Sequence, residues 1–165
     1  MSVKIKNRHR LKTKDIKKLQ NELKNTFDSV FFNEKSSVEI GDFEDIRMIL
    51  IDGEPCFVFH ENKIVFTLHG IKKYKPQKNF VVVDMGAVKF VTSGADVMVP
   101  GIVDADKDIA ENDQVWICDE NHHKPLAVGI AIMTGEQMIQ EEKGKAIRTI
   151  HYVGDRLWNF AAKSL

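Results

Sequence analysis

The chain's organisation is set by residues 83–102, which read Val83-Asp84-Met85-Gly86-Ala87-Val88-Lys89-Phe90-Val91-Thr92-Ser93-Gly94-Ala95-Asp96-Val97-Met98-Val99-Pro100-Gly101-Ile102. Asp84 is a favourable N-cap residue, so we expect a short helix over Met85–Ser93. Gly94 follows as the residue that ends the helix, at the C′ position where the left-handed backbone favours glycine. Val97–Val99 then reads as a strand, which Pro100-Gly101 ends.

Further short strands surround this stretch. Four apolar runs predict them: Phe80–Val83, Gln114–Cys118, Leu126–Met133 and Ala146–Val153. The polar turn Asp119–Lys124 joins two of these strands, and Thr134–Glu142 reads as a short helix with Thr134 as its cap. The order β-α-β-β-β-(α)-β, with glycines at the strand ends, is typical of a small, partly closed barrel.

The first half of the chain predicts a different unit. Ile16, Leu19, Leu23 and Phe27 recur at helical spacing, so we expect an amphipathic helix over roughly 14–26, capped by Thr13. The alternation of Lys4–Arg10 is typical of an edge strand or an extended arm.

Two hairpins follow in this half. Asp52-Gly53 joins Ile46–Ile51 to Glu54–His60 through a turn of the primed type, and Glu61-Asn62 leads on to Lys63–His69. In this register Phe57 faces Phe66, Phe59 faces Ile64, and Met48 extends the same face under the helix.

We therefore expect an α+β protein of two domains. A small basic α+β domain spans 1–75, a mixed β-barrel with short helices spans 79–158, and 159–165 is a C-terminal tail, with the basic connector 72–78 at the boundary. The zero net charge is divided between the halves. Residues 1–78 hold 16 Lys and Arg against 11 Asp and Glu, and residues 79–165 hold 8 against 13. Opposite charge in two halves predicts a directed electrostatic surface.

The positive charge is concentrated at the start of the chain. Nine cations precede residue 26, and we call them the basic cluster: Lys4, Lys6, Arg8, Arg10, Lys12, Lys14, Lys17, Lys18 and Lys24. The acids among them are Asp15 and Glu22. Such a cluster either contacts a polyanion or is a solvated face, and the pattern alone leaves both interpretations open.

Composition and spacing argue against other classes of protein. The longest uncharged stretch, residues 125–135, is too short to span a bilayer, and Met1–Arg10 lacks the apolar run of a secretory signal, so a soluble cytoplasmic protein is expected. Cys56 and Cys118 are interpreted as core residues, and His122-His123 as a solvent-facing turn. No P-loop, zincin or nucleophile pattern occurs, so we expect no enzyme activity, cofactor or metal.

The quoted stretch closely resembles the start of a PUA domain, an RNA-binding pseudobarrel. Further matching segments are Asp113-Gln114-Val115, Leu126–Ala131, Gly144–Ile147 and the tail Ile150-His151-Tyr152-Val153-Gly154-Asp155-Arg156-Leu157-Trp158. The tail resembles the malignant T-cell-amplified-sequence family, in which a PUA domain follows a small N-terminal domain. Archaeal members share this compact two-domain form.

The resemblance implies a site and partners. PUA domains hold RNA between the first helix, the following strand and the last strand, which here maps onto Lys89, Ser93, Gly94, Ala95, Asp96, Val97, Met98, Arg148 and Thr149. Gly94 and Gly101 are expected where the backbone needs a positive φ or approaches a ligand closely, and the amides of Gly94 and Ala95 are candidate ligand donors. Asp96 either accepts from a base or caps a turn.

The implied function is binding to the small ribosomal subunit and the tRNA acceptor end, in initiation or recycling. Eukaryotic relatives work with a partner called density-regulated protein. One alternative is an accessory factor for tRNA or rRNA modification. Another is a protein-interaction adaptor without RNA contact, against which the basic N-terminal helix argues.

Overall fold

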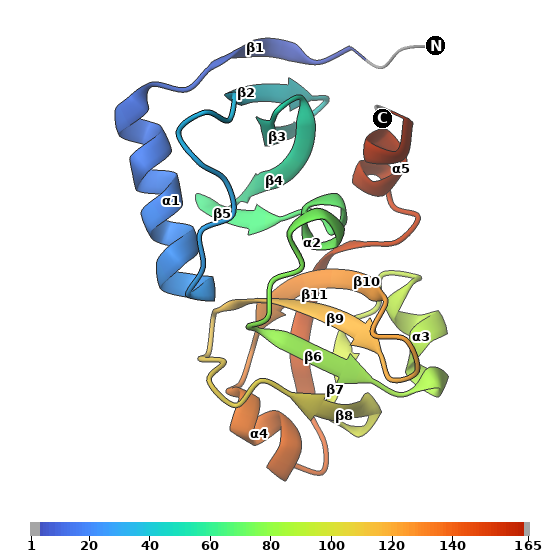
Figure 1. Ribbon diagram of the computed structural model, residues 1–165. Coiled ribbons are helices and arrows are strands. Elements are labelled where there is room, and N and C mark those ends of the chain that lie inside the picture. The colour runs from blue at the N-terminus through green and yellow to red at the C-terminus, as the bar shows by residue number, and fades with distance from the viewer. Residues whose placement is uncertain (1–3, 164–165) are drawn as a thin grey trace. The chain divides into compact units, whose positions relative to one another are not determined.

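The computed structural model describes residues 4–163, which form two compact units (Figure 1). Unit 1 runs to Pro76 and takes in the segment that begins at Arg156, and unit 2 is Gln77–Asp155. Unit 1 is a small α+β structure and unit 2 is a mixed β-barrel, which confirms the expected fold class.

Unit 1 is built on an antiparallel sheet whose neighbouring strands follow one another along the chain. Its strands are β1 (Lys6–Arg10), β2 (Val38–Phe43), β3 (Ile46–Ile51), β4 (Glu54–His60) and β5 (Lys63–Phe66). Strand β1 pairs with β2, so the basic start of the chain is an edge strand. Strand β2 was not expected from the sequence.

Both predicted hairpin turns are present. Asp52 and Gly53 have φ of 51° and 83°, and Glu61 and Asn62 have φ of 48° and 65°. Positive φ at both central residues is what a type I′ turn requires. The pairs Phe57–Phe66 and Phe59–Ile64 are confirmed. Met48 instead lies opposite Val58, and Ile49 lies opposite Phe57, so Met48 points to the other face of the sheet.

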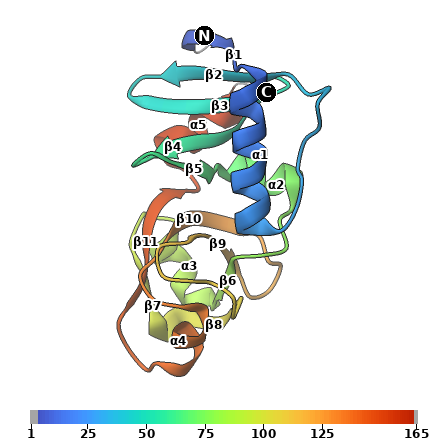
Figure 2. The ribbon, with the colours of Figure 1, turned by 90° about the vertical axis from the view of Figure 1, so that its left-hand side faces the viewer.

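Helices cover both faces of this sheet. Helix α1 (Thr13–Phe27) buries Leu19, Leu23 and Phe27. Thr13 is its first residue and not its cap as predicted; Lys12 occupies the N-cap position and makes no side-chain capping bond. Helix α5 (Arg156–Lys163) lies on the opposite side of the sheet from α1 (Figures 1 and 2). With both faces covered, four consecutive residues of β3 are buried, Met48–Ile51.

Helix α5 is held in unit 1 by an aromatic contact and by ion pairs. Phe160 stacks on Phe43 with 4.3 Å between the ring centroids. Arg156 pairs with Glu44 at 2.5 Å and with Asp45 at 2.7 Å. The helix crosses residue 158, where we expected the barrel domain to end and a tail to begin.

The segment expected as the end of a strand and a connector is partly helical. Strand β5 ends at Phe66, and α2 spans Leu68–Tyr74. The Thr67 hydroxyl accepts the Gly70 amide at 2.9 Å, which caps the helix, and donates to the Pro55 carbonyl at 2.7 Å. A β-carbon at Gly70 would lie 2.3 Å from the Cys56 carbonyl oxygen, so the helix approaches β4 too closely for a side chain there.

Unit 2 is a mixed sheet in the order β7-β11-β10-β9-β6-β8. Its strands are β6 (Phe80–Val83), β7 (Val97–Met98), β8 (Ile102–Ala105), β9 (Gln114–Asp119), β10 (Pro125–Ala131) and β11 (Lys145–Tyr152). Strands β6 and β9 are parallel, and the other pairs are antiparallel. The 3₁₀ turn η1 (Val99–Gly101) joins β7 to β8, the two ends of the sheet order, so the sheet nearly closes into a barrel. Strand β8 was not expected.

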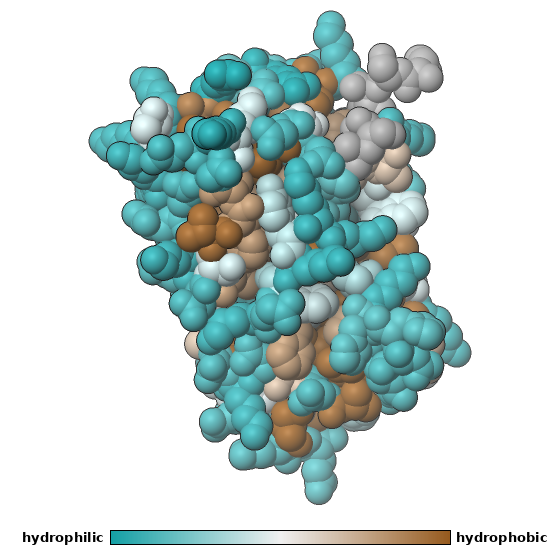
Figure 3. Space-filling view, viewed as in Figure 1, coloured by the Kyte–Doolittle hydropathy of each residue, from teal (hydrophilic) through white to brown (hydrophobic). Residues whose placement is uncertain are grey.

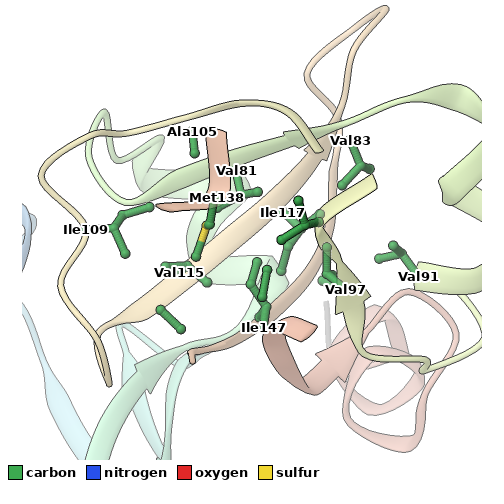
Figure 4. Packing of buried hydrophobic residues seen from close by; sticks show 14 of the residues in the cluster. Val81, Val83, Val91, Val97, Ala105, Ile109, Val115, Ile117, Met138 and Ile147 are labelled. Atoms are coloured by element: carbon green, nitrogen blue, oxygen red, sulfur yellow. The ribbon is translucent and has the colours of Figure 1, made fainter. Parts of the chain in front are cut away.

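The two short helices of unit 2 begin at the predicted caps. The Asp84 carboxylate accepts the Ala87 amide at 2.8 Å and starts α3 (Met85–Val91). Thr134 and Gln137 form a capping box at the start of α4 (Gly135–Gln140). Side chains from the strands and both helices fill the barrel (Figure 4), among them Val81, Ile117, Met138 and Ile147. Among residues 4–163, no helix is long and apolar enough to cross a membrane.

Candidate nucleic-acid interface

Eight of the nine residues proposed for RNA binding lie on one region of unit 2, at the end of α3, along β7 and on β11; the ninth, Val97, is buried beneath it. Strand β7 pairs with β11, so Met98 lies opposite Lys145. The Thr149 hydroxyl donates to the Ala95 carbonyl at 3.0 Å. We call this region the α3–β11 surface and define it by these residues: Lys89, Ser93, Gly94, Ala95, Asp96, Met98, Arg148 and Thr149.

Asp96 is the link between the two sides of this surface. Its Oδ1 accepts the backbone N–H of Thr149 at 2.9 Å, and its Oδ2 lies 2.9 Å from the Lys145 ammonium. The bond from Lys145 lowers the pKa of the Asp96 carboxyl below its ordinary value, and the Thr149 amide and the charge of Arg148 act in the same direction. The Asp96 carboxylate thus binds the distant strand β11, a structural role that neither of the two interpretations of the sequence included.

Gly94 has the positive φ that its place after α3 predicts, at 92°. A β-carbon there would also lie 2.7 Å from a ring carbon of Tyr152, so the position excludes a side chain for two reasons. The Gly94 amide donates to the Val91 carbonyl and the Ala95 amide to the Phe90 carbonyl, both at 3.1 Å. Both amides thus cap α3. The expectation that they are open donors for a ligand was wrong.

Gly101 does not have a positive φ. It lies in η1, its carbonyl accepts the Asp84 amide at 2.9 Å, and a β-carbon would approach the Ala87 β-carbon to 3.0 Å. Gly101 is therefore small because η1 packs against α3.

Exposure separates the proposed residues into two groups. Lys89, Met98 and Arg148 are exposed and can meet a ligand. The Val97 side chain is 2% exposed and packs in the core of the barrel. Ser93 is exposed, but its hydroxyl donates to the Phe90 carbonyl at 2.9 Å and so helps to end α3.

Sequence reasoning missed three residues of this region. Lys145 holds the Asp96 carboxylate, Tyr152 packs against Gly94, and Phe90 is an exposed ring at the end of α3. Lys145 and Tyr152 lie in the segments that resemble a PUA domain, but their contacts are with residues about 50 positions earlier. Phe90 was read only as part of the helix.

The basic cluster lies on β1 and α1 of unit 1 and on the residues next to them, Lys4 and Lys12, and all nine of its residues are exposed. Hydrophilic residues dominate the surface over α1 in Figure 3. Lys14, Lys17 and Lys18 lie on the side of α1 away from its buried stripe. Arg8 forms an ion pair with Glu39 at 3.0 Å, so part of its charge is compensated within the sheet.

The two cysteines are buried in the cores of the two units. Burial raises the pKa of both Cys56 and Cys118 to about 12, so each is a protonated core residue, as expected. Between residues 4 and 163, no group of three or more His, Cys, Asp or Glu side chains is placed to hold a metal ion.

Two family models match this sequence. The PUA domain model matches residues 79–153, and the model of a domain of unknown function, DUF1947, matches residues 7–74. The first match falls on unit 2 and the second on unit 1.

Relatives match over most of the chain. An uncharacterized protein of Methanocaldococcus jannaschii is 49% identical over 94% of this chain and 98% of its own length. Translation machinery-associated protein 20 of Saccharomyces cerevisiae is 35% identical over 78% of this chain and 75% of its own. Malignant T-cell-amplified sequence 1 of Rattus norvegicus is 32% identical over 94% of this chain and 91% of its own.

A solved structure is similar as well. A hypothetical protein of Pyrococcus horikoshii has a TM-score of 0.84 and 34% sequence identity, and the match covers 93% of this chain and 99% of that one.

Proposed function

We propose a function from the premise that this chain belongs to the family of PUA-domain proteins with an N-terminal DUF1947 domain, homologous to malignant T-cell-amplified sequence 1 and translation machinery-associated protein 20. The function is RNA binding in translation. The finer proposal is that the protein contacts the small ribosomal subunit and the tRNA acceptor end in the cytoplasm, during initiation or recycling. It binds rather than catalyses, and a density-regulated-protein-like partner is part of the same proposal.

The observation that carries the proposal is the division of charge between the two units. Unit 1 holds 17 Lys and Arg against 11 Asp and Glu, because it includes the two cations of α5 but not Lys78, and unit 2 holds 7 against 13. Phosphate contacts supply most of the sequence-independent affinity for RNA. Unit 1, with the exposed basic cluster, is therefore the source of affinity.

Unit 2 is then the source of selectivity. Phosphate contacts position a protein but carry no sequence information, whereas unpaired bases are recognised by a shaped surface. The α3–β11 surface offers exposed cations, Lys89 and Arg148, beside the apolar Met98. The negative charge of Asp96 is compensated by its ion pair with Lys145, which weakens the repulsion between this carboxylate and a phosphate.

Co-sedimentation with small ribosomal subunits tests the proposal. The full chain is compared with the charge reversal K14E/K17E/K18E, which alters the exposed side of α1. The matched control, K107E/K124E/K143E, makes the same change of net charge at exposed lysines of unit 2 outside the α3–β11 surface.

We expect the wild type and the control to co-sediment and the α1 variant to be lost from the subunit fraction. Association with free tRNA alone would instead favour the role in RNA modification. Association with neither RNA would contradict RNA binding and favour the adaptor.

A further inference from the structure

The side chain of Phe90 is unusually exposed for a large hydrophobic residue. Its side chain is 58% exposed, against 37% for Trp158. Among the large hydrophobic side chains from residue 4 to 163, only Val30 is more exposed. An aromatic ring held in water on a surface already implicated in binding points to a ligand contact.

The backbone beneath the ring is fixed. The Phe90 carbonyl accepts hydrogen bonds from the Ser93 amide at 3.2 Å, the Ser93 hydroxyl at 2.9 Å and the Ala95 amide at 3.1 Å. Ala95 is in turn bound by Thr149 of β11. The ring therefore projects from a rigid end of α3, and little backbone entropy is lost when it meets a ligand.

The helix leaves the ring uncovered. Helical side chains lean toward the preceding turn, where α3 has only Gly86 and Ala87. A β-carbon built on Gly86 would meet nothing within 4 Å except an oxygen of Asp84 at 3.3 Å. The turn that precedes the ring therefore carries only small side chains.

One cation lies next to this ring, and a second belongs to the same surface. The Lys89 ammonium is 5.1 Å from the ring centroid. Arg148 is exposed on β11 and close enough to Asp96 to lower its pKa. An apolar ring beside one cation, on a surface that carries a second one, is complementary to one nucleotide, whose base is flat and apolar on its faces and whose phosphates are anionic.

We propose that Phe90 stacks on an unpaired base at the single-stranded end of the bound RNA, while Lys89 and Arg148 bind the flanking phosphates. This inference rests on the proposed function and adds the atomic contact that distinguishes an unpaired end from a duplex. Every base has an aromatic face, so the contact reads whether a base is free and not which base it is.

The test is a titration of the full chain with two RNAs, a hairpin with a single-stranded 3′ tail and the same hairpin with a blunt end. The variants are F90A, F90Y, F90W and the matched control I139A, which removes an apolar side chain of 44% exposure from α4. A third RNA carries abasic sites throughout the tail and keeps its phosphates.

We expect F90A to weaken binding of the tailed hairpin by roughly 5- to 100-fold, the range for one stacked base, and to leave the blunt hairpin unchanged. F90Y and I139A should bind like the wild type. On the abasic tail, F90A and the wild type should be equal, because only the phosphates remain. F90W should also lose indole fluorescence when the tailed RNA is added.

Equal binding of the tailed hairpin by wild type and folded F90A would overturn the stacking contact and leave RNA binding intact, and Phe90 would then be a contact for a protein. A wild type that binds none of the three RNAs would overturn the proposed function together with this inference. Thermal unfolding of F90A establishes that the variant is folded.

Discussion

The Asp96 carboxylate accepts the backbone N–H of Thr149 at 2.9 Å, although the two residues are 53 positions apart in the sequence. With the Lys145 ammonium on its other oxygen, Asp96 ties the segment after α3 to the last strand of the barrel. The α3–β11 surface therefore depends on one charged side chain whose two oxygens are both bound to β11.

Asp96→Ala should loosen this surface. The substitution removes the acceptor of the Thr149 amide and leaves Lys145 without its carboxylate, a loss of about 1–3 kcal/mol. Hydrogen exchange should show faster exchange of the Thr149 amide, with little change in α4. Glu120→Ala, at an exposed acid of unit 2, is the control. Unchanged exchange at Thr149 would mean that the bond adds nothing to stability.

The same carboxylate predicts a pH dependence. Its folded pKa is lowered, so its contribution to stability is complete above the ordinary carboxyl pKa of about 3.9 and is lost as the pH falls through the folded value. The difference in unfolding temperature between wild type and Asp96→Asn should be constant at neutral pH and should shrink in acid below the ordinary value. A difference that persists at the lowest pH would assign the effect to shape instead of charge.

Gly94 and Gly154 form a matched pair for backbone strain. Their φ values are 92° and 91°, but a β-carbon at Gly94 meets the Tyr152 ring, whereas one at Gly154 meets nothing within 4 Å. Gly154→Ala should cost about 1–2 kcal/mol from the left-handed backbone alone. Gly94→Ala should cost more, because the ring must also move. Thermal unfolding measures both, and equal losses would show that Tyr152 yields freely.

Helix α5 should be required for the stability of unit 1. Phe160 is 2% exposed, and Phe160→Ala should cost about 3–5 kcal/mol through the cavity left against Phe43. Hydrogen exchange should rise in β2 and β3 and stay unchanged in β9. Lys163→Ala, at the exposed end of the same helix, is the control. Equal protection of β2 in both variants would contradict this role.

Local signals in the sequence were sufficient for many elements. The stripe Leu19–Leu23–Phe27 identified α1, the Asp52-Gly53 dipeptide identified its turn, and Asp84 and Thr134 identified two helix starts. Each of these depends on residues within a few positions of one another. The α3–β11 residues were grouped by the sequence resemblance instead, because the order of the PUA motifs along the chain shows which segments correspond to the first helix and the last strand.

The missed features depend on distant contacts. Arg156 of helix α5 binds Glu44, which lies 112 positions earlier in the sequence. The residues next to Arg156 carry no signal that predicts this partner. Gly70 lies inside α2, where glycine normally argues against a helix, because the close approach to Cys56 outweighs its low propensity. Val97 was assigned to the binding surface because motif order does not distinguish the two faces of a strand.

The most direct test of the division between an affinity unit and a selectivity unit is a titration of tRNA, with and without its single-stranded 3′ end, over a range of salt concentrations. For the wild type, log K should fall with log salt at a slope of about −3 if four phosphates are bound. K14E/K17E/K18E should weaken binding and reduce the steepness of that slope by roughly 2, while the preference for the intact 3′ end persists. A flat salt response of the wild type, or loss of that preference in the α1 variant, would contradict the account.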